Sequence, residues 1–464
     1  MRLDRLLGDV LVRHLRGDAA TEVSRIAHSS GSVVPGALFC CLRGLRSDGH
    51  DFAAAAVASG AVALLCSREL PLDVAQAVVG NPRAAMAMAA AELNGHPSRR
   101  LSVVGVTGTN GKTTTTHLLR AVLETSGVPA AVIGTLSGPR TTPEAPELQA
   151  ELSELAGAGT RAVALEVSSH ALAQHRVDAT WFEVAVFTNL SPDHLDFHTG
   201  MEDYFAAKAM LFEPERAGVA VVNADDEWGR RLLSSARLPT RPFSMDDAAD
   251  LAVARSSATF GWDGHPVRLR LGGTFNVSNA LAAATAAREL GVPPAAIAEG
   301  LSSVDTVPGR FQLLEAGQPF TVIVDYAHTP AGLEECLSAA RAAGTGLLTV
   351  VFGCGGERDQ AKRPAMGEVA ARLADRAVIT SDNPRGEDPD AIIAAVRAGT
   401  GTGAAVVNEP DRRAAIALAL AGASAEDVVV LAGKGHETTQ VVGSAMVPFD
   451  DRVVALEELR RLGW

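Results

Sequence analysis

Residues 103–116 read VVGVTGTNGKTTTT, and the organisation of the central part of the chain follows from them. The order is an apolar run, a turn with two glycines, and Lys112 followed by threonines. A buried strand that leads through such a turn into a helix points backbone N–H groups and the positive end of the helix dipole toward an anion. Lys112 can neutralise phosphate charge, and the Thr113 hydroxyl can bind Mg²⁺. We therefore predict a loop that binds a nucleoside triphosphate, the alternative being a glycine-rich turn without a ligand.

The composition limits the class of protein. The chain has 464 residues, of which 47% are hydrophobic and 20% are charged, and its formal net charge is −13. These values favour a globular protein of roughly two to four domains without general affinity for nucleic acid or anionic membranes. The N-terminus lacks a signal-peptide core, and no apolar run approaches the roughly 20 residues that cross a bilayer, so we expect a cytoplasmic protein without membrane insertion. Five scattered cysteines without CxxC spacing predict reduced thiols.

Three blocks along the chain predict three α/β domains, at 1–98, 99–308 and 309–464. The first ends in the turn formers NGHPS, which are typical of a linker. Apolar strands separated by helices in the other two blocks predict parallel sheets covered on both faces, the last of them Rossmann-like. The strands expected in the central block are 102–106, 130–133, 162–166 and 184–188. Those expected in the last block are 320–324, 347–352, 377–380 and 428–431.

Polar side chains follow the ends of the central strands. Lys112, Glu166 and His194 each come directly at or after a strand end. Because ligands of parallel sheets gather at the carboxyl ends of the strands, we expect these residues to share one site. Glu166 suits Mg²⁺, and the loop FTNLSPDHLDFH around His194 suits a second metal or a substrate carboxylate. The alternatives are a capping glutamate and a polar turn. Lys208 is a lone lysine on an apolar helix, where such a side chain usually extends to solvent.

Basic residues also gather in two loops of the last block. Arg358 lies in FGCGGERDQAKRP and Arg385 in SDNPRGEDP, within a chain that is acidic as a whole. Arginine forks are suited to bidentate binding of carboxylates. The competing interpretation is that each is a solvated surface charge.

Taken together, these motifs resemble those of the Mur ligases, the ATP-dependent enzymes that form amide bonds in peptidoglycan precursors. The resemblance spans nearly the whole chain and is nearest to the branch that adds the third amino acid of the stem peptide. The motifs occur in family order and read TGTNGKTT, EVSSHAL, FTNLSPDHLDFH, AAKAMLF, FNVSNALAA, VPGR, VDYAHTP, FGCGGERDQAKRP, SDNPRGEDP and GKGHET.

The resemblance implies a central P-loop ATPase domain, an N-terminal domain that binds a UDP-sugar and a C-terminal domain that binds an amino acid. It implies ATP and Mg²⁺, with one metal held by Thr113 and Glu166 and a second by His194 and a Lys208 that carries a carbamate derived from CO₂. Lys112, Glu166, His194 and Lys208 are implied to be catalytic. The implied ATP contacts are Gly108, Thr109, Asn110, Gly111, Lys112, Thr113, Thr114, Asn279, Arg310 and Asp325.

The resemblance also implies two further substrates, UDP-MurNAc-L-Ala-D-Glu and meso-diaminopimelate. The DNPR form ending at Arg385 is associated with diaminopimelate rather than L-lysine, because an arginine can grip its distal carboxylate and Glu437 its ammonium. The implied contacts of the UDP-linked dipeptide are Ser30, Thr141, Thr142, Ser168, Gln174 and Arg176. Those of the amino acid are Arg358, Asp382, Asn383, Pro384, Arg385, Gly433 and Glu437. We expect a monomer.

The chain departs from the family pattern in the part that would recognise UDP and the sugar. Ser29 and Gly31 replace two of three usual residues, Arg140 stands in place of an asparagine, and the stretch between Trp228 and Gly272 is short. The alternatives are therefore a ligase for L-lysine or another amino acid, another amide ligase of the Mur or folylpolyglutamate type, and a nucleotide-binding regulator without catalysis.

Overall fold

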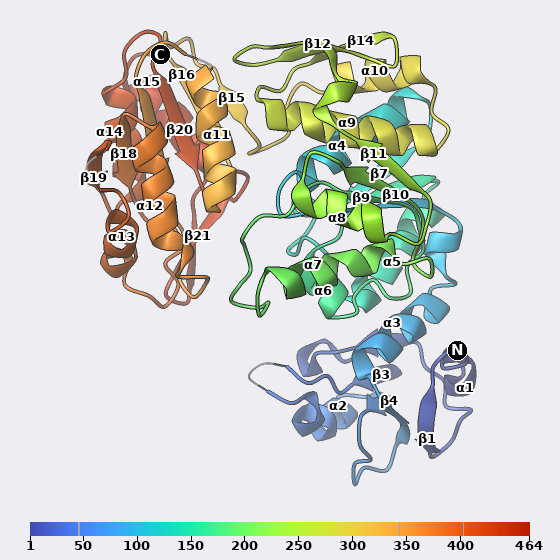
Figure 1. Cartoon of the computed structure of the whole chain (residues 1–464). Coiled ribbons are helices and arrows are strands. Elements are labelled where there is room, and N and C mark those ends of the chain that lie inside the picture. Colours follow the sequence, from blue (N-terminus) through green and yellow to red (C-terminus); the bar gives the residue numbers. More distant parts are fainter. Residues whose placement is uncertain (45–46, 343, 402) are drawn as a thin grey trace.

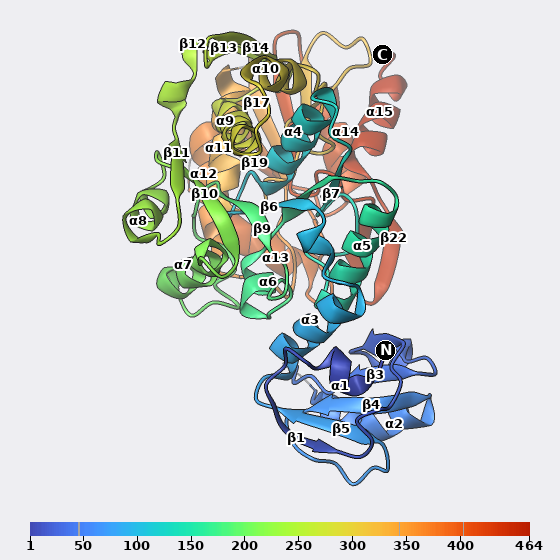
Figure 2. The same ribbon diagram turned by 90° about the vertical axis from the view of Figure 1, so that its right-hand side faces the viewer.

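The computed structural model describes residues 1–44, 47–342, 344–401 and 403–464. Three α/β regions follow one another along the chain, each built on its own main sheet (Figure 1). The N-terminal region lies at one end, and the central and C-terminal regions lie beside each other (Figures 1 and 2). The prediction of a three-part α/β chain is confirmed, whereas the exact boundaries at 98/99 and 308/309 stay predictions.

The N-terminal region holds a five-stranded sheet in the order β1-β5-β4-β3-β2, in which β1 alone runs antiparallel to its neighbour. Helix α3 connects it to the central region and packs on α5. Asn81 starts α3 by accepting hydrogen bonds from the backbone N–H groups of Arg83 and Ala84, and Pro82 takes the first helical position. The elements are α1 (Leu3–Leu6), β1 (Val12–Arg16), β2 (Arg25–Ala27), η1 (Ser30–Ser32), β3 (Ala37–Cys40), η2 (Gly49–Phe52), α2 (Ala53–Ala58), β4 (Ala61–Cys66), β5 (Ala75–Val79), α3 (Pro82–Leu93) and η3 (Pro97–Arg99).

The central region holds a six-stranded sheet in the order β11-β10-β9-β6-β8-β7, with every neighbouring pair parallel. Its strands are apolar and buried because helices cover both faces. The elements are β6 (Ser102–Thr107), α4 (Lys112–Thr125), β7 (Ala130–Ile133), α5 (Ala145–Gly157), β8 (Ala162–Glu166), α6 (Ser169–Ala173), β9 (Phe182–Phe187), α7 (Met201–Ala209), η4 (Met210–Phe212), β10 (Ala217–Asn223), α8 (Glu227–Ser235) and β11 (Thr240–Phe243).

The short stretch after β11 forms a small antiparallel sheet and two helices. Helices α9 and α10 pack against α4, and alanines fill much of that contact. This packing fixes the helix that follows the glycine-rich turn. The elements are η5 (Met245–Asp247), β12 (Ala249–Val253), β13 (Ala258–Trp262), β14 (His265–Leu269), α9 (Thr274–Glu289) and α10 (Pro294–Ser302).

The C-terminal region holds a second six-stranded sheet, ordered β15-β16-β20-β17-β18-β19, which is parallel except for β15. A separate hairpin, β21–β22, follows it, and α11 lies on the side that faces the central region (Figure 1). The elements are β15 (Gln312–Leu314), β16 (Thr321–Asp325), α11 (Pro330–Ala342), β17 (Leu348–Phe352), α12 (Lys362–Leu373), β18 (Arg376–Ile379), α13 (Pro389–Arg397), β19 (Ala405–Asn408), α14 (Arg412–Ala421), β20 (Val428–Ala432), β21 (Thr439–Val442), β22 (Ala445–Pro448) and α15 (Asp451–Arg461).

Two other expectations concern the chain as a whole. All five cysteines are free and buried, as expected for reduced thiols. Among the described residues, no helix combines the length and the apolar character that a membrane span requires.

Candidate active site

One large cavity, of about 1070 Å³, lies between the central and C-terminal regions. Its walls come from the carboxyl ends of strands in both large parallel sheets, which is where ligands of such sheets bind. It therefore joins loops that are far apart in the sequence, from Thr109 to Val441. The residues singled out from the sequence that line it are Thr109, Asn110, Gly111, Lys112, Thr113, Thr114, Thr141, Thr142, Glu166, Ser168, Arg176, His194, Asn279, Arg310, Asp325, Arg358, Asp382, Asn383, Arg385, Gly433 and Glu437.

The turn between β6 and α4 is held by neighbouring loops as well as by its own side chains. Gly111 has φ +86°, and a Cβ there would collide with the side-chain oxygen of Asn279. Asn110 is clamped, since its N–H donates to Asn189 Oδ1 (2.9 Å) and its carbonyl accepts from Thr188 Oγ1 (2.6 Å). Because α4 begins at Lys112, the positive end of its dipole faces the cavity.

Lys112 folds over this turn. Its Nζ donates to the carbonyl oxygens of Gly108 and Thr109, each at 2.8 Å. Burial lowers the pKa of Lys112, and the nearby Glu166 and Asp193 partly oppose this effect. An ammonium held at a helix N-terminus is arranged to meet a phosphate.

An oxygen-rich group lies beside the start of α4. Glu166 is fully buried and accepts from Thr113 Oγ1 (3.0 Å), from Thr135 N (2.9 Å) and from Thr135 Oγ1 (3.0 Å). Arg310, from the C-terminal side of the cavity, donates to Thr113 Oγ1 at 3.0 Å. A hydroxyl and a carboxylate at this point form a donor set that fits Mg²⁺, a hard cation that takes oxygen ligands.

Lys208 lies behind the turn and not at the surface. Its side chain is 1% exposed, its Nζ donates to Gly108 O at 2.8 Å, and it lies 4.7 Å from the centroid of the Tyr204 ring. The usual arrangement, in which a lone lysine extends to solvent, is therefore excluded. Burial, together with the charge of Lys112, holds the pKa of Lys208 well below its ordinary value.

His194 lies near the same turn, with its ring centroid 6.0 Å from that of Tyr204. It adopts a left-handed backbone conformation with φ +56°, and its Nε2 lies 3.3 Å from Asp193 Oδ2. Its ring meets that of His170 edge-on at 4.7 Å. Burial lowers the pKa of His194, so its imidazole is neutral and can ligate a metal.

The part of the cavity that we expect to take the nucleoside is formed by groups with fixed orientation. Asp325 is buried and accepts from the backbone N–H groups of Phe311 (2.7 Å) and Ala327 (2.8 Å). Asn279 donates to Asn276 Oδ1 at 3.2 Å. Both residues can present oxygens to hydroxyl or amino groups of a nucleoside.

A second wall holds residues assigned to the dipeptide substrate. Thr142 Oγ1 donates to Glu166 O (2.8 Å) and accepts from Ser168 N (3.0 Å). Arg176 donates to Thr142 O (3.0 Å) and pairs with the buried Glu144 (3.0 Å). Arg140, one of the departures from the family pattern, also lines the cavity and lies 3.6 Å from the same carboxylate.

Five singled-out residues do not line the cavity. Gly108 and Lys208 lie directly behind its wall, and Gln174 accepts from Arg176 at 2.7 Å. Pro384 lies between two lining residues. Ser30 lies in η1 of the N-terminal region and does not line this cavity, whereas His28, two residues before it, contacts Glu147 of α5 at 3.1 Å.

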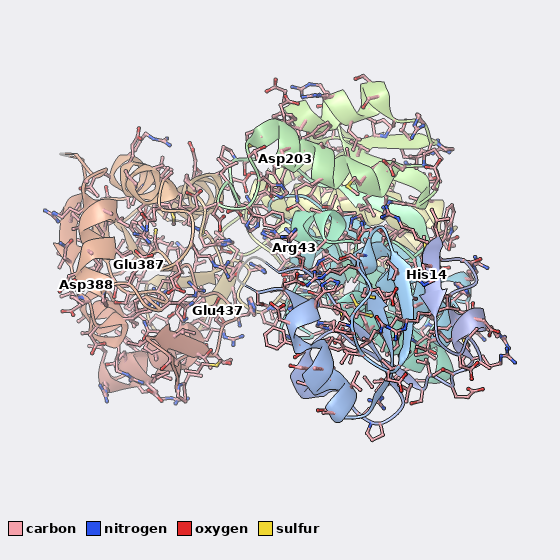
Figure 3. All side chains as sticks on the ribbon, turned by 90° about the horizontal axis from the view of Figure 1, so that it is seen from below. His14, Arg43, Asp203, Glu387, Asp388 and Glu437 are labelled. Carbon is pink, nitrogen blue, oxygen red and sulfur yellow. The ribbon has the colours of Figure 1, made fainter. Side chains whose placement is uncertain are left out.

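The amino-acid side of the cavity is a side-chain network. Asn383 Nδ2 donates to Glu437 Oε2 and to Asp382 Oδ1, each at 2.8 Å. Arg385 has φ +53° and donates through Nη1 to Gly356 O at 2.7 Å. Glu437 lies on the face of the C-terminal region that is turned toward the rest of the molecule (Figure 3). Carboxylate and guanidinium groups thus line the same cavity, the combination that we expect for binding an amino acid.

Several lining or supporting residues were missed by sequence reasoning. Thr135 and Asn189 fix the oxygen-rich group and the turn, Lys434 holds Glu437, and Glu335 lines the nucleoside side. Of these, Asn189 and Lys434 carried a signal, as parts of the quoted motifs FTNLSPDHLDFH and GKGHET.

Comparison with known proteins agrees with this arrangement. Three family models match successive parts of the chain: the Mur ligase family catalytic domain at 22–106, the Mur ligase middle domain at 106–287 and the Mur ligase glutamate ligase domain at 309–435. A curated relative from Syntrophomonas wolfei, named UDP-N-acetylmuramoyl-L-alanyl-D-glutamate--2,6-diaminopimelate ligase, is 43% identical, with 99% of each chain covered.

The chain belongs to the Mur ligase family.

A relative of the same name from Streptomyces coelicolor is 44% identical to this Mur ligase and covers 96% of it and 94% of its own length. A solved structure of that name has a TM-score of 0.69 at 31% identity and covers 100% of this chain and 99% of its own. MurF from Acinetobacter baumannii shares the fold, with a TM-score of 0.68 at 21% identity. Family membership makes this Mur ligase an ATP-dependent, amide-forming enzyme of peptidoglycan precursor synthesis.

Proposed function

We propose that this Mur ligase joins meso-diaminopimelate to the D-Glu carboxylate of UDP-MurNAc-L-Ala-D-Glu, with conversion of ATP to ADP and phosphate. One observation carries the proposal: a single cavity is lined by both the phosphate-type turn and the Asp382–Arg385 loop. The names of the curated relatives, which are 43% and 44% identical, support the same substrates.

The first step suits the central side of the cavity. A carboxylate oxygen of the dipeptide attacks the γ-phosphorus of ATP, the bond from that phosphorus to the β–γ bridging oxygen breaks, and an acyl phosphate and ADP form. Negative charge gathers on the transferred phosphoryl group, so Lys112 and Arg310 lower the barrier by electrostatic attraction. Thr113 and Glu166 would hold one Mg²⁺, which supplies charge neutralisation when bound.

The second step needs the C-terminal side. The amine nitrogen of the amino acid attacks the acyl carbon, the C–O bond to phosphate breaks, and the amine loses a proton to leave a neutral amide. Asn383, Arg385 and Glu437 orient the amino acid, which raises the effective concentration of the amine at the acyl carbon. Arg358 adds a second cation on this side.

Charge explains the choice of amino acid. Diaminopimelate carries a distal carboxylate that Arg385 can bind with two hydrogen bonds, whereas L-lysine has none and would leave that guanidinium unpaired. Glu437 offers an acceptor for an ammonium group. A carboxylate–guanidinium pair therefore favours diaminopimelate.

We also propose that Lys208 carries a carbamate. Its lowered pKa favours the neutral amine, which is the form that reacts with CO₂, and Lys112 lies close enough to compensate the resulting negative charge. The carbamate and His194 would hold a second Mg²⁺. Incubation with ¹³C-bicarbonate should give a carbamate carbon signal by NMR in the wild-type protein and none in Lys208→Ala. A wild-type protein without that signal would reject the modification.

A coupled ADP-release assay tests the proposed reaction. ADP should form when UDP-MurNAc-L-Ala-D-Glu, diaminopimelate and ATP are all present. Omission of either the UDP-linked dipeptide or diaminopimelate should stop ADP formation. L-Lysine is run in parallel. Turnover with L-lysine alone would reassign the third amino acid, and no dependent turnover with either would reject the ligase.

The remaining expectations are a monomeric state, a cytoplasmic location and no binding of nucleic acid. The net charge of −13 supports the last of these expectations. Light scattering on the purified chain measures the oligomeric state, and a dimer mass would reject the monomer.

A further inference from the structure

Lysine is unusually rare in this chain, and its positions are not random. The sequence has 41 lysine and arginine residues, of which four are lysines: Lys112, Lys208, Lys362 and Lys434. Lys112 and Lys362 line the cavity, and the other two hydrogen-bond to groups that form its loops. The chain thus uses arginine for its cations everywhere outside the site.

This distribution carries a chemical meaning. Arginine presents a planar fork of five donors, whereas lysine presents a compact ammonium whose three donors can point to three separate acceptors. Where only positive charge is needed, this chain has arginine. A retained lysine therefore marks a position where the compact ammonium itself is required.

The surroundings of Lys434 fit that requirement. Its side chain is 0% exposed, and its Nζ donates to Glu437 Oε2 (2.9 Å), to Thr439 O (2.7 Å) and to Asn383 Oδ1 (3.3 Å). These three acceptors belong to different parts of the amino-acid side of the cavity. An arginine in the same enclosed space would have to displace at least one of them.

The network also explains how Glu437 and Asn383 keep their orientation. Lys434 and Asn383 share the same oxygen of Glu437, and Asn383 Oδ1 accepts from Val441 N at 2.9 Å as well as from Lys434. The oxygen Oε1 of Glu437 has no hydrogen bond within the described part of the chain. It is therefore the oxygen left for an incoming ammonium.

We propose that Lys434 is a positioning residue that sets the affinity for the amino-acid substrate by holding Glu437 and Asn383 in place. The inference rests on the proposed function, because it assigns to these two residues the binding of the third amino acid. Lys434 itself does not touch the reacting atoms.

The loops that hold Asn383 and Lys434 are stabilised by a second interaction, which does not involve Lys434. Arg412 and Asp451 form a fully buried ion pair with a separation of 2.6 Å. Arg412 also donates hydrogen bonds to Ala432 O (2.9 Å) and to Ser381 O (3.3 Å). These carbonyls lie directly before the Lys434 and Asn383 segments. A role of Lys434 in orientation can therefore be distinguished from a role in folding.

The test compares Lys434→Arg and Lys434→Met with the wild type. Steady-state ADP release gives KM for diaminopimelate, ATP and the UDP-linked dipeptide, and urea unfolding gives stability. KM for diaminopimelate should rise about tenfold in Lys434→Arg and up to about a hundredfold in Lys434→Met, as for loss of hydrogen bonds to charged groups. KM for ATP should stay within about twofold, because Lys112 and its turn are untouched.

A matched control and a double-mutant cycle complete the experiment. Arg413→Met removes a cation of the same region that pairs with Glu457 and Glu458 and contacts no lining residue, so all three KM values should be unchanged. The KM for diaminopimelate of the double variant Lys434→Met, Glu437→Gln should be little higher than that of the more affected single variant, since both substitutions remove the same contact.

Four results would overturn the proposal: a wild-type KM for diaminopimelate in Lys434→Arg, an equal rise in the KM of ATP, additive effects in the cycle, or loss of the folded state in both Lys434 variants. Failure of the proposed function gives a different pattern, in which the wild type itself turns over another amino acid. The same comparison is then made with that amino acid, and Lys434→Arg with an unchanged KM would still reject the inference.

Discussion

The two sides of the cavity are built in different ways. On the central side, Lys112 donates to two backbone carbonyls, and the turn is clamped through Asn110 and by the close approach of Asn279. On the C-terminal side, Asn383 and Glu437 are held mainly by other side chains, above all by Lys434. The first arrangement depends on the backbone of a parallel sheet, and the second on side chains of opposite charge.

Because of this difference, we expect phosphoryl transfer to depend on the central side of the cavity and the choice of amino acid to depend on the C-terminal side. A backbone frame is changed little by a single surface substitution, so phosphoryl transfer is kept while other parts vary. A side-chain network changes with any of its members, so the choice of amino acid can be altered one residue at a time. Substitutions on the central side should therefore reduce turnover, and those on the C-terminal side should change stability or KM.

The largest effect is expected from Lys112→Met. Loss of the ammonium at the start of α4 should lower kcat/KM about 10³-fold, since it removes a charge that faces the developing phosphoryl charge. The measurement is ADP release as a function of ATP concentration, with the other two substrates saturating. Arg120→Met, on the exposed face of the same helix, serves as the control and should keep wild-type turnover. A Lys112 variant that keeps a tenth of the activity would contradict the assignment.

The next effect concerns the stability of the C-terminal side. Arg412→Met leaves Asp451 as a buried, unpaired charge and should lower the free energy of unfolding by about 3–5 kcal/mol. Urea unfolding measures it. Arg413→Met breaks an exposed pair with Glu457 and one of two pairs of the buried Glu458, which keeps Arg461, and should cost about 1 kcal/mol. Equal losses in the two variants would show that the buried pair has no special role.

Glu335 should make stability depend on pH. Partial desolvation at the cavity wall, followed by the charges of Asp325, Glu334 and Asp226, raises the pKa of the Glu335 carboxyl to about 7, above its ordinary range, although the side chain is still reached by solvent. Because the folded pKa is the higher one, the stabilising effect of the bound proton is present at low pH and is lost as pH rises through 7.

Glu335→Gln should therefore be more stable than the wild type at pH 8, but by about 1 kcal/mol at most because solvent screens this exposed side chain, and the gain should shrink toward pH 5. Urea unfolding at both values measures it. The neighbouring Glu334→Gln, at a carboxylate that is 48% exposed and paired with Arg372, is the control and should show little pH dependence of its own. A gain in Glu335→Gln that is equal at the two pH values would refute the shifted pKa.

The smallest effect is expected from Arg385→Lys. An ammonium then replaces the planar guanidinium, so KM for diaminopimelate should rise about tenfold to a hundredfold. The ratio of kcat/KM for diaminopimelate to that for L-lysine should fall. KM values for both amino acids and for ATP give the answer. An equal change in the KM of ATP would mean that the two sides of the cavity are not separate.

Much of the fold was predictable because the signals are local. The buried strands β6, β8, β16 and β20 begin and end within two residues of the expected limits, since each is an apolar run bounded by turn formers. The sheet at β12–β14 and the hairpin β21–β22 were not expected, because their strands are short and many of their side chains are exposed. Such strands lack a clear hydrophobic period.

The site was predictable in its members more than in its contacts. Motif residues such as Lys112, Glu166 and Asn383 could be singled out, and strand ends indicated that they meet. Their partners could not be: Thr135 lies 31 positions from Glu166, and Lys434 lies 51 positions from Asn383. No local pattern encodes a hydrogen bond between residues so far apart. Ser30 shows the converse, a motif position that does not line the cavity.

The five buried cysteines have a practical consequence. Burial raises the pKa of the Cys41, Cys66 and Cys354 thiols to about 12, 11 and 12, so they are protonated at neutral pH and react slowly with maleimides. The surface of the native chain therefore offers no competing thiol. One exposed cysteine introduced on α8 and one on α13 would accept a donor–acceptor dye pair without removal of any natural residue. Energy transfer between the dyes would then follow how far the two walls of the cavity approach each other as each substrate is added.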